Sequence, residues 1–139
     1  MADEAIIRSS FRILKGTYDF QTHPQVFRTD ITNARGPSPG VVLATTEGVN
    51  VDLSALTTPA LCQLINLDST NFVEYGIWDT VEFYPLGELL AGEHTVLRLS
   101  RNLGKSFGTG TGTVNTTTYS LRVKADTASC YVQVNAFDA

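Results

Sequence analysis

The sequence predicts a single all-β domain over residues 1–139, an antiparallel β-sandwich or jelly roll of about seven to nine strands. Two observations favour this fold: short apolar runs with a period of two recur along the chain, and turn-forming residues separate them. A third is that helix signals are weak. The best, Leu86 to Leu90 and then Thr58-Pro59, are too short for more than about one turn of helix.

The clearest alternation lies in the carboxy-terminal third of the chain. From Tyr119 to Asp126 apolar and polar residues alternate, and the pattern returns from Cys130 to Ala136 after a turn at Asp126-Thr127-Ala128. Each run therefore has one apolar and one polar face, as a half-exposed strand does. We expect the two runs to pair as an antiparallel hairpin.

Similar runs occur earlier in the chain, and Gly, Pro, Asp, Asn or Ser bound several of them. The expected strands are Ile6–Leu14, Gln25–Ile31, Gly40–Thr45, Leu61–Leu67, Phe72–Trp78, Val81–Tyr84 and Thr95–Ser100. No repeat or linker divides the sequence. We therefore expect one domain, with a short N-terminal arm over residues 1–5 and a flexible Gly/Thr loop over residues 104–113.

Charge and hydropathy argue against two classes of partner. The net charge is −4 and the basic residues are scattered, so the chain lacks the basic patch of a nucleic-acid-binding protein. Its acidic start is followed by no long apolar run, and no stretch is long enough to span a bilayer. We expect no nucleic acid and no membrane as partner, and a protein that is made and kept on the cytosolic side or leaves the cell by lysis.

The residues that usually carry chemistry form no recognisable site. Cys62 and Cys130 sit in apolar runs and are expected to be buried free thiols, although a disulfide between neighbouring strands is the alternative. His23 and His94 have no metal-ligand spacing, and Gly104-Lys105-Ser106 lacks the earlier glycine of a phosphate-binding loop. We therefore expect no catalytic residues, no metal, no cofactor and no enzymatic activity.

Aromatic and acidic residues gather in the middle of the chain. The rings are Phe72, Tyr75, Trp78, Phe83 and Tyr84, and the acids are Glu74, Asp79, Glu82 and Glu88. Large rings at alternate positions favour a sandwich core over an exposed platform for sugars, although the run places rings on both faces. The acids are expected to be solvent-facing charges rather than a glycosidase pair.

One segment, Thr17 to Pro24, breaks the alternation and combines aromatic residues with a proline. This composition suits an ordered segment that lies on a partner, and the alternative is an ordinary loop. We predict an intersubunit contact here. The contact residues would be Tyr18, Phe20, His23 and Pro24.

From about Leu61 to Ser100, and again from Tyr119 to Ala136, the chain resembles the small β-sandwich proteins of tailed-phage virions. The pieces that carry the resemblance are Leu64–Gly76 with its Asp-Ser-Thr-Asn turn, Phe83-Tyr84-Pro85-Leu86, Ala91-Gly92-Glu93 and Leu121–Ala125. They cover roughly half of the chain and describe strands and turns, so they specify a fold more than an activity.

The resemblance implies a capsid decoration or cement protein, located in the virion, that binds the major capsid protein and stabilises the assembled head. It also implies a homo-oligomer, with a trimer favoured. Two alternatives stay open at this point: a component of the phage tail or head-tail connector, and a carbohydrate- or receptor-binding module.

Overall fold

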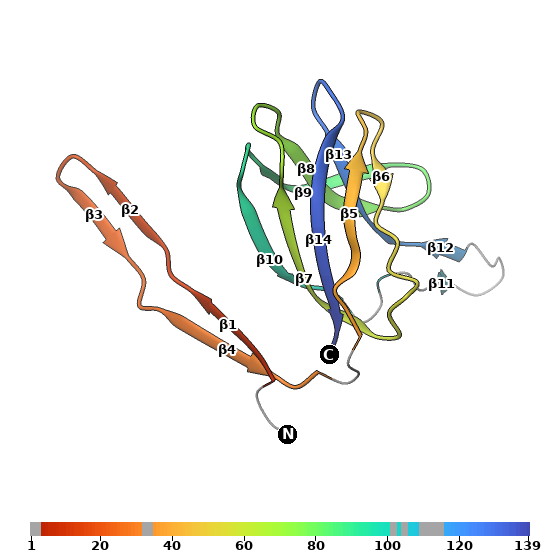
Figure 1. Cartoon of the computed structure of the whole chain (residues 1–139), viewed down its shortest axis with the longest axis horizontal. Helices are drawn as coiled ribbons and strands as arrows, with labels where there is room; N and C mark the ends of the chain where they lie inside the picture. Colours follow the sequence, from red (N-terminus) through yellow and green to blue (C-terminus); the bar gives the residue numbers. More distant parts are fainter. Residues whose placement is uncertain (1–3, 32–34, 101–102, 104–105, 109–115) are drawn as a thin grey trace.

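Two four-stranded antiparallel sheets pack together, and a long β-hairpin extends from them (Figure 1). The computed structural model describes residues 4–31, 35–100, 103, 106–108 and 116–139. The predicted all-β sandwich is confirmed. The described residues form fourteen strands, which is more than expected, but the eight strands of the two sheets fall within the predicted number.

The first sheet has the strand order β10-β7-β14-β5 and the second has the order β6-β13-β8-β9. The first consists of β5 (Ser38–Ala44), β7 (Pro59–Asn66), β10 (His94–Arg98) and β14 (Cys130–Asp138). The second consists of β6 (Val49–Asn50), β8 (Val73–Trp78), β9 (Phe83–Leu89) and β13 (Ser120–Ala125). A separate small ladder pairs β11 (Ser106–Gly108) with β12 (Thr116–Thr118).

The core between the sheets is aliphatic. Alternate residues of each strand point inward, and burying each large aliphatic side chain contributes roughly 1.5–3 kcal/mol. The predicted inward faces of β13 and β14 are confirmed: Leu121, Val123 and Ala125, and Cys130, Val132, Val134 and Ala136, are all buried. Among the five predicted core rings, only Tyr75 packs against this cluster, and it is partly buried. The prediction that the rings build the core was therefore wrong for the other four.

The predicted hairpin between the last two strands was wrong. β13 pairs with β6 and β8, whereas β14 pairs with β5 and β7, so the two strands lie in different sheets. The turn at 126–129 crosses from one sheet to the other. Because each strand buries its apolar face against the same core from opposite sides, the alternation is the same as in a hairpin.

The two segments with weak helix signals are strands. Leu86 to Leu89 belong to β9, which pairs with β8 and buries Leu89, and Pro59 begins β7. The expected strand Val81–Tyr84 starts only at Phe83, because residues 79–82 form the turn between β8 and β9. Pairing with a neighbouring strand here outweighs the helix preference of the leucines.

Both cysteines are free and buried, as predicted. Burial raises the pKa of the Cys62 thiol to about 12, so almost no reactive thiolate exists near pH 8. We expect Ellman's reagent to label neither thiol rapidly in the folded protein. Both should react in guanidinium chloride, at least about 1,000-fold faster, because labelling of the native chain requires opening of the core. Rapid labelling of the native protein would contradict this.

The N-terminal hairpin is built in two sections. Near its root, β1 (Ala5–Ser9) pairs with β4 (Gln25–Thr29), and further out β2 (Arg12–Lys15) pairs with β3 (Tyr18–Gln21). The expected strand Ile6–Leu14 is thus divided into β1 and β2. Residues 5–29 are called the arm below.

Two predicted segments, a short N-terminal arm and a flexible loop, fall largely outside the described residues. Of the N-terminal arm expected over residues 1–5, the structure describes only the last two residues, and Ala5 already belongs to β1. Of the Gly/Thr loop expected over 104–113, it describes only 106–108, which form β11.

Candidate interaction surface

The arm is one continuous hairpin about 35 Å long, at roughly 3.3 Å per residue. Between its two sections, the amide of Thr22 donates to the carbonyl of Phe11, and the amide of Phe11 donates to the Thr22 hydroxyl. At the tip, Gly16 occupies the first position of a two-residue loop with φ of 59°. A positive φ is required there by the commonest tight hairpin turns.

One side of the outer section is apolar. Ile13 lies opposite Phe20 and Lys15 lies opposite Tyr18, so these residues share one face of the ladder. Phe11 joins them, because its ring meets that of Phe20 edge-on with centroids 6.3 Å apart. The side chains of Phe11, Ile13, Tyr18 and Phe20 form what we call the apolar arm face, and they are between 43% and 60% exposed.

The opposite side of the outer section is mainly polar. Arg12 donates to both carboxylate oxygens of Asp19, with its Nη2 2.8 Å from Oδ2, and this pairing raises the pKa of the guanidinium. The pair is exposed, so water and salt screen it. The outer section is therefore amphipathic, with only Leu14 as a large apolar side chain on its polar side.

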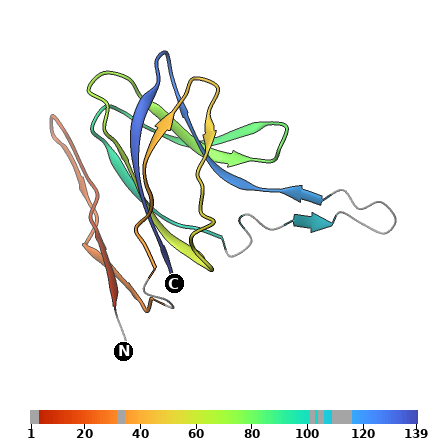
Figure 2. The ribbon, with the colours of Figure 1, turned by 45° about the vertical axis from the view of Figure 1, so that its right-hand side comes forward.

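The root of the arm contacts the sandwich. The guanidinium of Arg98 on β10 lies 5.3 Å from the ring centre of Phe27. Further along, Gly36 packs so closely on Phe137 of β14 that a Cβ there would lie 2.5 Å from the ring. The outer strands β2 and β3 stand clear of both sheets in two views (Figures 1 and 2). The chain's own sandwich therefore leaves the apolar arm face uncovered.

All four residues predicted as contacts lie on the arm. Tyr18 and Phe20 belong to the apolar arm face, whereas His23 and Pro24 are exposed in the connection between β3 and β4. Their role in contacts stays a prediction. Sequence reasoning missed Phe11 and Ile13, although their alternation with Arg12 and Leu14 could have placed them beside Phe20 on a two-residue period.

A second apolar surface lies on the outer side of the first sheet. Leu43 on β5 is directly opposite Tyr131 on β14, and both are exposed. Val41 is on the same side, and the amide of Leu67 bonds to the carbonyl of Tyr131. We call Val41, Leu43, Leu67 and Tyr131 the outer-face patch. Beside this patch, side-chain hydrogen bonds join Gln63, Gln133 and Asn135.

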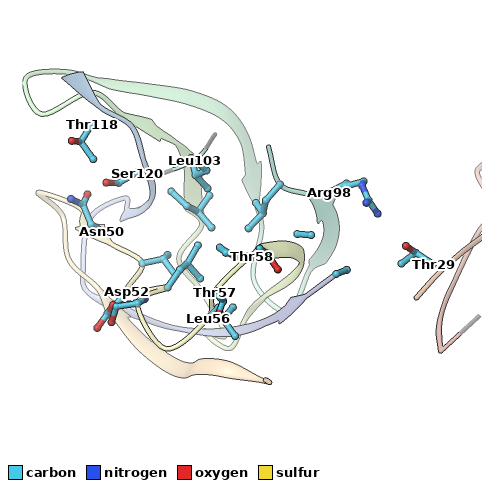
Figure 3. A pocket seen from close by; sticks show the side chains of 18 residues that line it. Thr29, Asn50, Asp52, Leu56, Thr57, Thr58, Arg98, Leu103, Thr118 and Ser120 are labelled. Atoms are coloured by element: carbon cyan, nitrogen blue, oxygen red, sulfur yellow. The ribbon is translucent and has the colours of Figure 1, made fainter. Parts of the chain in front are cut away.

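A pocket of about 1050 Å³ opens at one end of the sandwich (Figure 3). Leucines, among them Leu56 and Leu103, form much of its lining. Its two described charged residues lie apart: Arg98 is on the side of the arm, and Asp52 accepts a bond from the amide of Ser54. Bonding to Ser54 lowers the pKa of Asp52. The polar groups do not converge on one point, as an active site would require.

The predicted acids include one turn-forming residue. Asp79 accepts bonds from the amides of Val81 and Glu82, which lower the pKa of its carboxyl. The exposed Tyr84 hydroxyl donates to the same carboxylate and thereby has its pKa raised. The Asp79 carboxylate therefore stabilises the turn between β8 and β9.

The aromatic run does not present an open platform at Trp78. The guanidinium of Arg122 lies 4.0 Å from the ring centre of Trp78 and covers that side of the ring. The same guanidinium donates to Asn50 Oδ1 and to the carbonyls of Glu47 and Gly48. Arg122 thus fastens the β5–β6 turn to the second sheet.

Replacing Arg122 with lysine should lower the free energy of unfolding by about 1–3 kcal/mol, because an ammonium cannot stack on Trp78 and reach three acceptors together. Urea denaturation would measure the loss. Lys124→Arg on the same strand provides the control and should change stability by less than about 0.5 kcal/mol. Equal stability of the two variants would show that the guanidinium has no such role.

Among the described residues, no three His, Cys, Asp or Glu side chains gather as metal ligands. The same part of the chain contains no helix long and apolar enough to cross a membrane. Comparison with known proteins gives no significant match to a family model, to a curated protein or to a solved structure.

Proposed function

We propose that this protein is a structural component of a tailed-phage virion, a decoration protein that binds the assembled head and stabilises it. The observation that carries the proposal is the arm: a projecting hairpin with four large, exposed apolar side chains on one face. Soluble proteins rarely leave such a surface uncovered unless it binds a partner.

Other features support a binding role. The described pocket has no convergent polar groups, and the rigid sandwich has a closely packed aliphatic core. The sequence resemblance to phage virion proteins implies that the partner is the major capsid protein. A rigid module with a projecting arm is suited to bridging neighbouring capsid subunits.

Stabilisation of the head would follow from mass action. A protein that binds only the assembled shell adds about 2.7 kcal/mol per site to its stability when present at 100 times its dissociation constant. Repetition of the contact over a lattice multiplies this effect, since each copy that bridges two subunits opposes their separation.

The test uses heads of the encoding phage that lack this protein. We expect the purified full-length protein to co-sediment with such heads at a saturating ratio and to raise the temperature at which they release DNA. Electron microscopy should place it over the capsid lattice. Binding at the tail or neck would move the protein to the connector class, and no binding to any virion part would overturn the proposal.

A further inference from the structure

We propose that the apolar arm face docks on the outer-face patch of a second copy of this chain, so that the protein assembles by exchanging arms. This proposal concerns the partner of the apolar arm face. In the exchanged assembly that face is covered by a second copy, so a phage head would be bound by other surfaces of the oligomer, and head binding is tested separately.

The first argument is that the arm, as an exposed hairpin, would be stabilised by packing its apolar face on another surface. An isolated two-stranded hairpin is at best marginally stable in water. Three aromatic rings and one isoleucine on the apolar arm face are about half exposed, and Tyr18 is the most exposed of them at 60%. Aromatic anchors of this kind dominate the binding energy of protein interfaces.

The second argument concerns area. The outer section that carries the apolar arm face is about 17 Å long and 10 Å wide, so one of its faces covers roughly 170 Å², whereas one face of the whole arm covers roughly 350 Å². In an arm exchange each copy is engaged twice, once through its arm and once through its patch. The area buried per copy is then about 350 Å² for the outer section alone and about 700 Å² if the whole arm lies on the partner, which approaches the roughly 800 Å² per partner of a standard stable interface.

The third argument is charge, which favours docking of the arm on the sandwich of a second copy over pairing with a second arm. The arm carries four cationic residues and one carboxylate, Asp19, which gives a net charge of +3 for residues 5–29; the cations are Arg8, Arg12, Lys15 and Arg28. Residues 36–139 contain five basic and ten acidic residues, a net charge of −5. Two arms packed on each other would juxtapose like charges, whereas an arm on a sandwich joins opposite ones.

The same complementarity holds locally. Lys15 lies on the ladder face that also carries Tyr18 and Phe20. The outer-face patch is bordered by acidic turns at one end of the first sheet: Asp68 follows Leu67, and Asp126 lies in the turn that precedes β14. A cationic, aromatic arm face thus matches an apolar patch with an acidic border.

The patch is open to a second copy because the chain's own arm is rooted elsewhere. Phe27 contacts Arg98, and Arg98 is paired with Leu61 at the start of β7. Leu67 and Tyr131 lie near the other end of the same sheet, where Tyr131 remains 59% exposed. The arm then projects away from the sandwich (Figure 1).

The first test is the mass of the full-length protein in solution across a range of concentrations, by light scattering and sedimentation. We expect a defined oligomer. Phe20→Ser on the arm and Tyr131→Ser on the patch should each weaken association roughly 10- to 100-fold. Leu86→Ser is the control, because Leu86 is also exposed, at 68%, but lies on β9 of the second sheet. It should leave the mass unchanged, and circular dichroism should show all three variants folded.

The second test identifies the contact. A chain with Thr17→Cys, in the tip loop beside Tyr18, is mixed with a chain with Ser69→Cys, in the exposed turn after Leu67, and a short bis-maleimide is added. Both substitutions keep Phe20 and Tyr131, and the native cysteines are buried. We expect cross-linked dimers in the mixture and few with Thr17→Cys alone. Cross-linking of Thr17→Cys to itself without the mixed product would show arm-to-arm pairing and overturn the proposal.

The two proposals fail separately. A protein that is monomeric at all concentrations but binds heads through its arm would refute arm exchange and leave the decoration role intact. An oligomer that depends on Phe20 and Tyr131 but binds no virion part would support arm exchange and refute the decoration role.

Discussion

Replacing Asn66 with leucine is expected to lower the free energy of unfolding by about 3–5 kcal/mol, a large part of the stability of a small domain. Asn66 ends β7 and its side chain is fully buried. Its amide nitrogen lies 2.9 Å from the carbonyl oxygen of Asn71 and 3.1 Å from those of Leu89 and Leu90. Its carbonyl oxygen accepts a bond from the amide of Asp68 at 3.0 Å.

The size of the effect follows from what the substitution leaves behind. One side chain satisfies main-chain groups of the β7–β8 connection and of the end of β9. Leucine fills a similar volume but removes the donor to the carbonyls of Asn71 and Leu89 and the acceptor of the Asp68 amide, whereas the Leu90 carbonyl keeps a bond from the amide of Glu93. Each buried group left unsatisfied costs about 1–3 kcal/mol. Chemical denaturation measures the loss, and Asn71→Ala, which retains the main-chain acceptor of this network, serves as a milder comparison.

Asn66→Asp tests whether lost hydrogen bonds, rather than a change in side-chain shape, cause the loss of stability. The introduced carboxylate is nearly isosteric but faces carbonyl oxygens and has no proton to donate. Burial and these oxygens favour its protonated form, so its pKa is raised in the folded state. The variant should therefore gain stability as pH falls from 7 toward 5, because the folded state binds the proton more tightly than the unfolded state. A stability that did not change over this range would contradict the proposed network.

The fold class and the inward-facing residues could be predicted because a strand with one buried and one exposed face has apolar and polar residues in alternation. Val132 and Val134 alternate with Gln133 and Asn135, and burial follows that alternation along β14. What the period cannot specify is the sheet to which a strand belongs. β13 and β14 have apolar faces turned to one core from opposite sides, and a turn such as 126–129 reverses the chain equally well within a sheet or between sheets.

The arm illustrates a second limit. Phe11, Ile13 and Phe20 show the same alternation as buried residues of the sandwich, although they are exposed. A period of two reveals that a face is apolar, but whether the chain's own core or another molecule covers that face depends on where the strand lies. Tyr18 and Phe20 could be proposed as contacts only because the segment from Thr17 to Pro24 interrupts the pattern.

The second large effect is expected at Asp138, close to the carboxy-terminal end of β14. This side chain is fully buried, and its two carboxylate oxygens accept bonds from the amides of Thr57 and Thr58 at 3.1 and 2.8 Å. Asp138→Ala should lower the free energy of unfolding by about 2–4 kcal/mol, because two part-buried main-chain donors lose the carboxylate that accepts from both. Asp138→Asn keeps one acceptor oxygen and should cost about half as much.

The site of this bond network adds a functional consequence. Asp138 follows Phe137, the residue on which Gly36 packs at the root of the arm. Loss of the network should free the end of β14 and loosen this root, so that Asp138→Ala weakens arm-dependent association in addition to lowering stability. Hydrogen exchange at the amides of Thr57 and Thr58 measures the first effect, and sedimentation of the still-folded variant measures the second. Glu88→Gln, at an exposed position on β9 of the second sheet, is the control. Equal exchange rates in the two variants would show that the Asp138 carboxylate does not hold this end of the sandwich together.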